Sequence, residues 1–597
     1  MTYINERLKK TLSDNSLNEV IKYDNTVLTC SDLEKQIKRY VSFLRGSINI
    51  NTDAQYVLIY LKSPLEGVVA QLACLMYGAI AVPLNKEAPL SYYAIDRMDG
   101  VACMITDEDF KLEQFNFPII NICDTQSDSI QKGEDSPCRE PEKNHNNYSH
   151  CIITSGTTGT PKAVLLRQDA ILNQVDAKIK LLKMNSNNRL CVATSLSFVA
   201  SIWQILATIF VGGTLILLDE EERHNPYLVF KRAEEHNATI LCVVPSVLKS
   251  FLLTNTGKRK ITLDSLSTLV LTGEALYSDI AMRFYEDYAT TIINAFGQTE
   301  TSDDTFHYIV PRDIDSKIYP VVPIGYPIDN IAYKIVDENG SEVLHGEKGE
   351  LCISGLCLAE GYIWNGGQPD ARNSFRLLSG TDSEVLFFTG DLVSQDDGGP
   401  VVFHGRVDNQ IKISGNRIEP EAIEACCLSI EGITDALAFK YETPSGAQLA
   451  LKYVSSDKYN VTVEQIRDFL IKNLPAYMIP NDIKKIDALV YSANGKKIRN
   501  TYTPQSQNTK QADSEPESST EDLVVEAIMK IITKVTGQIF DKNDDSLELL
   551  DSLQYISLLV ELENLFGVEF EDRQLNLGAF LSLDELSGYV VKQNLTR

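Results

Sequence analysis

The chain has 597 residues, which is too long for one hydrophobic core and predicts several domains. Its formal net charge of -27 excludes a nucleic-acid partner held by phosphate neutralisation. No apolar run approaches the roughly 18 residues of a membrane span, and the polar first residues lack the apolar segment of a secretion signal. The twelve cysteines show no metal-site spacing, which indicates reduced thiols and a cytoplasmic protein. The lack of an apolar span predicts that this protein has no membrane contact.

Short apolar runs that suit buried strands alternate with helical patterns between about residues 55 and 402. The strand-like runs are QYVLIYL, SHCIITSG, TILCVV, TLVLTG and TTIINAFG, which begin at residues 55, 149, 239, 268 and 290. PLEGVVAQLACLMYG, residues 64–78, has the pattern of a helix. This alternation predicts a large α/β subdomain over residues 1–407, with sizeable parallel sheets.

Three further segments follow. The sequence becomes charged, strand-like and then helical, which predicts a small α+β subdomain over residues 408–503. Residues 504–520, PQSQNTKQADSEPESST, lack core-forming side chains and indicate a flexible linker. Residues 521–597 begin with apolar side chains at helical spacing, which predicts a small all-α domain.

The segment TSGTTGTPKAV, residues 154–164, follows a predicted strand and favours a phosphate-binding loop. Its glycines allow backbone N–H groups to converge on an anion, and Lys162 adds a positive charge. The spacing differs from that of a Walker loop. The alternative is a mobile glycine- and threonine-rich turn with one solvated lysine.

Five motifs in order, spread over about 340 residues, resemble those of the adenylate-forming family. This family includes acyl-CoA synthetases, luciferases and the adenylation domains of nonribosomal peptide synthetases. The motifs are TSGTTGTPKAV, AFGQTE at residues 295–300, FFTGDL at 387–392, GRVDNQIKISGNRIE at 405–419 and NGK at 494–496.

The resemblance implies that a carboxylate attacks the α-phosphate of ATP, and that a thiol then displaces AMP from the acyl-adenylate. It implies catalytic roles for Lys162, Thr299, Glu300 and Lys496, with Glu300 as the Mg²⁺ ligand and Lys496 near the α-phosphate. It also implies that Asp408 is the hinge of a mobile subdomain that carries Lys496. It implies that Arg406 lies close to Asp391, which accepts hydrogen bonds from the ribose. The nucleotide-binding residues that it implies are Thr154, Ser155, Gly156, Thr157, Thr158, Gly159, Gly273, Glu274, Ala275, Asn294, Ala295, Phe296, Gly297, Asp391 and Arg406.

The last domain resembles acyl and peptidyl carrier domains. Its Asp551-Ser552-Leu553 segment opens an amphipathic helix, and Ser552 matches the serine that receives 4′-phosphopantetheine. A hydroxyl at a helix N-terminus suits a phosphate group, although an N-capping serine has the same pattern. The expected partners are a phosphopantetheinyl transferase, a downstream biosynthetic enzyme acting in trans and an MbtH-like activator.

The segment SLSFVASIWQIL, residues 195–206, resembles the helix that begins the family's acyl pocket. Domains that activate α-amino acids have an aspartate directly after the phenylalanine, where this chain has Val199. An unpaired ammonium there would be costly, so the resemblance implies a small acid without an α-amino group. The pocket residues that it implies are Val199, Ala200, Trp203, Cys242, Val270, Thr272, Ala295, Asp303 and Asp304.

The two acids at the end of this pocket suggest a substrate cation, and the pattern resembles that of β-alanine-activating domains. We expect a β- or ω-amino acid whose cation binds one of Asp303 and Asp304, and if Asp304 faces inward we expect Asp303 to face solvent. A solvated loop or a helix cap at these acids is the alternative. Val199 would also tolerate an α-keto, hydroxy or aryl acid, and a catalytically silent protein that presents the carrier is a further alternative.

Overall fold

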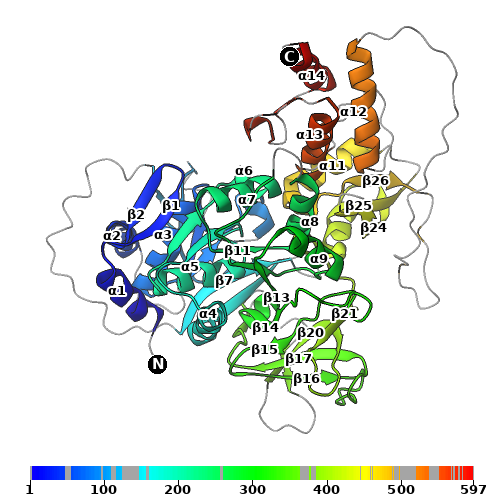
Figure 1. Ribbon diagram of the computed structural model, residues 1–597. Coiled ribbons are helices and arrows are strands. Elements are labelled where there is room, and N and C mark those ends of the chain that lie inside the picture. Colours follow the sequence, from blue (N-terminus) through cyan, green and yellow to red (C-terminus); the bar gives the residue numbers. More distant parts are fainter. Residues whose placement is uncertain are drawn as a thin grey trace. The chain divides into compact units, whose positions relative to one another are not determined.

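The computed structural model of the protein contains two compact units (Figure 1). The first unit holds Met1–Glu220, Arg232–Pro245 and Leu263–Glu419, and the second holds Glu221–Lys231, Ser246–Thr262 and Pro420–Arg597. The structure describes residues 3–47, 56–93, 95, 98–108, 110, 116–123, 147–155, 161–255, 260–363, 375–377, 385–443, 446–456, 459, 461–486, 489, 497, 520–536, 547, 550, 552–566, 568, 570, 572–575, 579–580 and 582–595.

Two large sheets form the centre of the first unit, and the nine-stranded sheet carries most of the candidate site. In spatial order its strands are β15 (Tyr326–Pro327), β14 (Asp303–Ile309), β13 (Thr291–Gln298), β12 (Thr268–Leu271), β11 (Ile240–Val243), β9 (Arg189–Val192), β10 (Thr214–Leu217), β1 (Glu19–Tyr23) and β2 (Thr26–Thr29). The seven-stranded sheet runs β18 (Gly361–Tyr362), β8 (Lys162–Arg167), β7 (Tyr148–Thr154), β4 (Ile80–Pro83), β3 (Tyr56–Tyr60), β5 (Val101–Thr106) and β6 (Ile119–Asn121).

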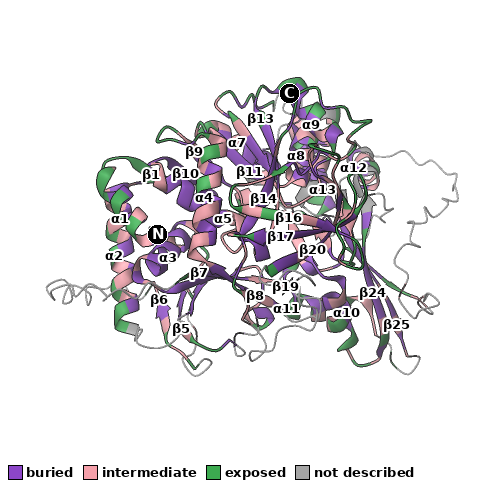
Figure 2. Cartoon of the chain, turned by 90° about the horizontal axis from the view of Figure 1, so that it is seen from below, coloured by how far each residue is buried: buried purple, intermediate pink, exposed green. Residues whose placement is uncertain are grey.

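A smaller antiparallel sheet and a hairpin complete the strands of this unit. The sheet runs β16 (Ile331–Val336), β17 (Gly349–Gly355), β20 (Val385–Ser394) and β19 (Phe375–Leu377), with β21 (Val402–Arg406) paired to β20, and the hairpin joins β22 (Ile411–Ile413) to β23 (Asn416–Ile418). The helices are α1 (Ile4–Asp14), α2 (Cys30–Ser47), α3 (Pro64–Tyr77), η1 (Leu90–Tyr93), α4 (Gln168–Leu182), α5 (Ala200–Phe210), α9 (Ser278–Asp287) and η7 (Thr299–Thr301). Figure 2 shows the strands of the large sheets mostly in the colour of buried residues.

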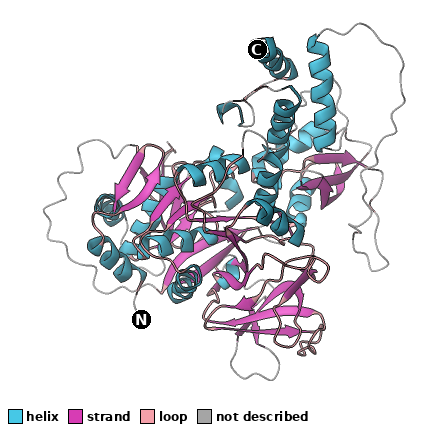
Figure 3. Ribbon diagram, viewed as in Figure 1, coloured by secondary structure: helices cyan, strands magenta, loops and turns pink. Residues whose placement is uncertain are grey.

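The second unit combines a three-stranded sheet with helices (Figure 3). Its strands are β24 (Ile433–Thr443), β25 (Gly446–Ser455) and β26 (Asp482–Lys485). Its helices are α8 (Pro245–Thr254), α10 (Pro420–Leu428), α11 (Val463–Asn473), η8 (Ala476–Met478), α12 (Thr520–Thr536), α13 (Ser552–Phe566), η9 (Asp572–Leu575) and α14 (Leu583–Leu595). The short helix α6 (Glu220–Arg223) and α7 (Pro226–Glu235) span the division between the units.

The predicted strands and the predicted helix of the large subdomain are confirmed. The five apolar runs form β3, β7, β11, β12 and β13, and residues 64–77 form α3. The ends of α3 follow from its sequence. Ser63 caps its start by accepting a hydrogen bond from the Glu66 amide, and Gly78 ends it with a φ of 88°.

The contacts group the chain differently from the predicted boundary at residue 407. The first unit extends to Glu419 and so includes the β22–β23 hairpin. The Gly415 amide of this hairpin donates to the Glu274 carboxylate at 2.9 Å, which helps to explain the grouping. Thr520, the last residue of the predicted linker, begins α12, and residues 504–519 lie outside the described part of the chain.

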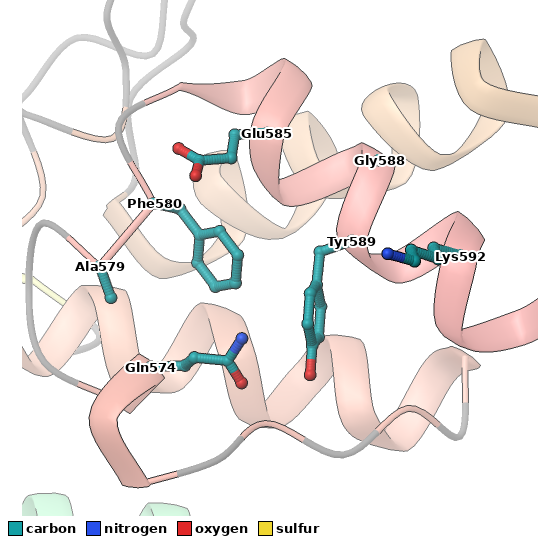
Figure 4. A pocket seen from close by; sticks show the side chains of 7 residues that line it. All are labelled: Gln574, Ala579, Phe580, Glu585, Gly588, Tyr589 and Lys592. Atoms are coloured by element: carbon teal, nitrogen blue, oxygen red, sulfur yellow. The ribbon is translucent and has the colours of Figure 1, made fainter.

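Helices are the regular elements among the described residues of 520–595. Phe570, Phe580 and Tyr589 form an aromatic cluster there, with ring centroids 5.3–5.8 Å apart. Beside it lies a cavity of about 520 Å³ (Figure 4), which is lined by Gln574, Ala579, Phe580, Glu585, Gly588, Tyr589 and Lys592. None of the helices described is both long and apolar enough to cross a bilayer.

Candidate active site

The residues of the predicted acyl pocket gather where β11, β12 and β13 lie side by side. Cys242 and Val270 are partners in the parallel pairing of β11 with β12, and Val270 pairs with Ile293 of β13. Cys242, Val270 and Ala295 are all buried in the hydrophobic core. In open α/β sheets, ligands bind at the carboxyl ends of the strands, and these residues lie in that part of the fold.

Helix α5 supplies the first pocket residues. Val199 is its N-cap residue, and Ala200 is its first residue. Trp203 lies one turn further along with 1% of its surface exposed. Trp203 is thus part of the hydrophobic core, and the expectation of a small acyl group stays a prediction.

The connection between β13 and β14 is strained at the two predicted acids. Ser302 has a φ of 58° and Asp303 a φ of 112°, which is unusual for a residue other than glycine. Gly297 lies opposite this turn, and a Cβ atom at position 297 would be 2.0 Å from the Asp303 carbonyl oxygen. Glycine is therefore required at position 297 for the backbone of β14 to approach this closely.

Asp304 is buried and engaged on both of its carboxylate oxygens. The hydroxyl of Thr272, which directly follows β12, donates to Oδ1 at 2.5 Å, and the Lys178 ammonium donates to Oδ2 at 2.5 Å. Burial raises the pKa of Asp304, but the attraction of Lys178 outweighs burial, so that the pKa is below its ordinary value. The Asp304–Lys178 contact is therefore an ion pair at neutral pH.

Lys178 is a part of the site that our sequence analysis missed. It is fully buried, and its ammonium lies 4.9 Å from the ring centroid of Trp203. Burial lowers its pKa, but Asp304 and Asp303 raise it above the ordinary value. Its sequence signal is weak: Lys178 follows Gln174 by four residues on the buried face of α4, where a lysine is unusual.

Asp303 is buried as well, with 4% of its surface exposed. The expectation that Asp303 faces solvent is therefore wrong, because β14 begins at Asp303 and pairs with β13 in the core. The alternatives of a solvated loop and a helix cap are excluded for the same reason. Among the described residues, no group donates a hydrogen bond to Asp303 Oδ2. Burial and repulsion from Asp304 raise the pKa of Asp303 to about 8.

Glu300, the predicted metal ligand, is fully buried beside Thr299 in η7 and faces a cation from the β22–β23 hairpin. Arg417 Nη1 lies 2.9 and 3.1 Å from its two oxygens, and the Tyr362 hydroxyl donates at 2.8 Å. Burial raises the pKa of Glu300, but Arg417 outweighs burial and lowers it. Each carboxylate oxygen has two lone pairs, so these hydrogen bonds leave room for a metal ion, and the Mg²⁺ role of Glu300 stays a prediction. No cluster of three metal-ligating side chains occurs among the described residues.

Asp391 and Arg406 come together as the resemblance implied. Arg406 Nη1 donates to Asp391 Oδ1 at 2.7 Å, and Gln298 donates to Oδ2 at 2.5 Å. The rest of the Arg406 guanidinium contacts Asp408, the predicted hinge residue, at 2.7 and 2.8 Å. Gly390 has a φ of 74°, which favours glycine, and a Cβ there would lie 2.6 Å from the Arg406 guanidinium.

The two ends of the predicted phosphate loop face each other across antiparallel strands. Thr154 of β7 is the register partner of Lys162 of β8, and the Lys162 ammonium lies 5.1 Å from the ring centroid of Tyr362. The Ser155 hydroxyl donates to the Arg417 carbonyl at 2.7 Å. The hairpin is thus attached to the loop. Gly156, Thr157, Thr158 and Gly159 lie outside the described residues.

The predicted base-binding residues lie on β13 and on the loop after β12. Asn294 donates its amide to the carbonyls of Val322 and Pro323, at 3.3 and 2.9 Å. Phe296 is partly buried, with the rings of Phe306 and Phe403 each 6.3 Å away. The residues of the loop itself are Gly273, with a φ of 88°, Glu274, which accepts from Gly415, and Ala275.

Lys496 and Ser552 are the two remaining predicted residues. Lys496 lies outside the described residues, although the next residue, Lys497, forms an ion pair with Asp435 at 2.9 Å. Ser552 is the first residue of α13, the place predicted for it. The roles of both residues stay predictions.

Comparisons with known proteins show which family the chain resembles. The family model described as AMP-binding enzyme matches residues 9–363. Zwittermicin A synthase ZmaJ of Bacillus cereus is 29% identical over 484 residues, which cover 79% of this chain and 89% of that protein. Bacitracin synthase 3 of Bacillus licheniformis is 28% identical over 562 residues, which cover 92% of this chain but only 9% of that much longer protein.

Solved structures share the fold at lower identity. Holo-PA1221, an NRPS protein containing adenylation and PCP domains, matches with a TM-score of 0.79 and 19% identity, over 100% of this chain and 98% of that chain. NpsA-ThdA, an artificially fused adenylation–PCP di-domain from Klebsiella oxytoca, matches with a TM-score of 0.70 and 21% identity, over 81% of this chain and 94% of that chain. These matches show an adenylation-domain fold with mixed sheets.

Proposed function

Because the chain belongs to the AMP-binding enzyme family, we propose that it activates a small carboxylic acid without an α-amino group and loads it onto its own carrier domain. The substrate carboxylate attacks the α-phosphorus of ATP, the bond to the bridging oxygen breaks, and pyrophosphate leaves. A thiolate then attacks the acyl carbon of the adenylate, the bond between that carbon and the phosphate oxygen breaks, and AMP leaves. The acyl thioester passes to a downstream enzyme.

The position of Val199 carries the proposal for the substrate. It is the N-cap residue of α5, at the start of a helix whose next turn places the buried Trp203 in the core. An apolar residue there provides no carboxylate for an α-ammonium, and burial of an ammonium without a partner costs far more than burial of a neutral polar group. A β- or ω-amino acid such as β-alanine keeps its ammonium away from Val199.

Two observations support thioester loading on the chain itself. Helices α12, α13 and α14 form the described part of the C-terminal segment, and Ser552 begins α13. The matched structures PA1221 and NpsA-ThdA are described as containing PCP domains. We propose Ser552 as the 4′-phosphopantetheine attachment site, which requires a phosphopantetheinyl transferase as a partner.

A second candidate substrate is an α-keto, hydroxy or aryl acid. It is favoured by Lys178, which already neutralises Asp304 without any substrate cation. A non-catalytic protein that only presents the carrier is less well supported. The reason is that two pairs of predicted nucleotide-binding and catalytic residues lie together, namely Asp391 with Arg406 and Thr154 with Lys162.

The substrate proposal is tested by carboxylate-dependent ATP–pyrophosphate exchange over a panel of acids. We expect exchange with β-alanine or a longer ω-amino acid, and none with α-alanine. The intact mass of the phosphopantetheinylated protein, after incubation with ATP and the mixed acids, then identifies the loaded acyl group. Exchange only with α-amino acids would refute the assignment of Val199. Exchange only with uncharged acids would favour the second candidate.

A further inference from the structure

The end of the predicted acyl pocket contains two buried acids and one buried base. Two carboxylates, Asp303 and Asp304, lie there with one ammonium, that of Lys178. The other titratable groups that face them are neutral at pH 7. Burial lowers the pKa of His307 on β14 to about 3 and raises that of the Cys242 thiol on β11. Among the described residues, the set is therefore neutral while Asp303 keeps its proton, and it lacks one positive charge when Asp303 is ionised.

The hydrogen bonds show which carboxylate is short of a partner. Both Asp304 oxygens accept hydrogen bonds, from Thr272 and from Lys178. Asp303 Oδ2 is buried and accepts none from the described residues. A buried carboxylate that lacks a partner is costly, so this atom requires either a proton or a bound cation.

We propose that Lys178 is a specificity-determining residue, because it occupies Asp304 permanently and leaves Asp303 as the carboxylate that binds the single distal ammonium of the substrate. This inference rests on the proposed function, and it narrows the substrate class to small acids with one amino group on the β-carbon or a later carbon. When the ammonium binds, the proton held by Asp303 leaves to solvent. The ammonium then completes a set of two carboxylates and two cations with no net charge.

The test compares β-alanine with butanoate, its uncharged isostere, in ATP–pyrophosphate exchange. The readout is the kcat/KM for β-alanine divided by the kcat/KM for butanoate. A general loss of activity lowers both values by the same factor and leaves this ratio unchanged. We expect Asp303→Asn to lower this ratio by at least about 100-fold, mainly through the KM for β-alanine. Asp304→Asn should also lower it, because Lys178 then stands unpaired and repels the substrate ammonium.

The decisive variant is the double substitution Lys178→Met with Asp304→Asn. It removes the buried ion pair without changing the net charge, so the preference for β-alanine should return to within about threefold of the wild-type ratio. A residue that acted only on folding would change both acids together and leave the ratio unchanged. If Asp304→Asn fails to fold, the double variant is compared with the same protein that also carries Asp303→Asn.

The results that would overturn this inference differ from those that would refute the proposed function. An unchanged ratio in Asp303→Asn, or a double variant that still disfavours β-alanine, would overturn the inference while adenylation stands. A wild-type protein that activates butanoate, pyruvate or benzoate but not β-alanine would also overturn the inference alone. A wild-type protein that supports exchange with none of the acids would refute the proposed function and, with it, this inference.

Discussion

Two acids that are adjacent in sequence have different chemical states in the folded protein. Asp304 is ionised and paired with Lys178, whereas burial and the neighbouring carboxylate raise the pKa of Asp303 to about 8. Glu300 is likewise buried and ionised, because Arg417 provides a neighbouring positive charge. At all these residues, the neighbours in space and not the residue type decide the charge.

The raised pKa of Asp303 predicts how substrate affinity depends on pH. Protonated Asp303 cannot attract an ammonium, so the KM for β-alanine should fall about tenfold per pH unit as the pH rises towards 8, and should level off above it. Measurement of KM between pH 6 and 9 checks this, with butanoate as the control acid. A KM for β-alanine that is constant over this range would contradict the assignment.

The same residue predicts how stability depends on pH. Unfolded Asp303 loses its proton near its ordinary pKa of 3.8, whereas the folded residue keeps the proton up to about 8. The folded state therefore binds more protons between these values, and the contribution of Asp303 to the free energy of unfolding should fall by up to about 1.4 kcal/mol per pH unit as the pH rises. Asp303→Asn should remove this contribution in urea unfolding of the substrate-free protein.

At the scale of elements, the turn from β13 to β14 positions the pocket acids. It includes a register shift between Phe296 and Gly297 and the positive φ of Asp303. Irregularities of this kind next to strands reorient side chains and are common at functional sites. Here they bring the buried Asp303 next to the Asp304–Lys178 pair.

Gly297→Ala tests the importance of this turn. The added methyl would lie 2.0 Å from the Asp303 carbonyl oxygen, so the substitution should lower the free energy of unfolding by about 1–3 kcal/mol or more. Gly46→Ala in α2 is the matched control, because a Cβ there meets nothing within 4 Å and alanine favours a helix by about 1 kcal/mol. Urea unfolding compares the two variants, and equal stability would contradict the close approach.

At the scale of the whole molecule, the proposed function divides the work between two segments. The first unit contains those of the proposed nucleotide-binding and acyl-pocket residues that the structure describes, and the C-terminal helices carry Ser552. Adenylation and thioester loading should therefore be separable by substitution.

Lys496→Ala and Ser552→Ala are a reciprocal pair for this test. Lys496→Ala should lower pyrophosphate exchange by at least about 100-fold, because the positive charge near the α-phosphate is lost, while Ser552 still accepts phosphopantetheine. Ser552→Ala should retain exchange but show no added mass of phosphopantetheine or acyl group. Exchange and intact mass are measured on both proteins. Unchanged exchange in Lys496→Ala would refute its assigned role.

Much of the fold was predictable because the signals are local. Apolar runs such as TILCVV and TLVLTG are strands whatever their partners, and the Ser63, Pro64 and Gly78 signals fix both ends of α3. The five motifs also predicted that Asp391 and Arg406 would meet. The burial of Asp303 was not predictable, since DDTFHYIV suits a loop, a cap or a strand until β13 pairs with it.

The sequence by itself thus determined the family resemblance, the order of the elements and the positions of the acids. Only the tertiary structure decided what compensates the charge of these acids. Lys178 is 126 residues from Asp304, and Arg417 is 117 residues from Glu300. The physical reason is that burial makes an unpaired charge costly, but its partner can come from any element that packs against it, and no spacing in the sequence records that contact.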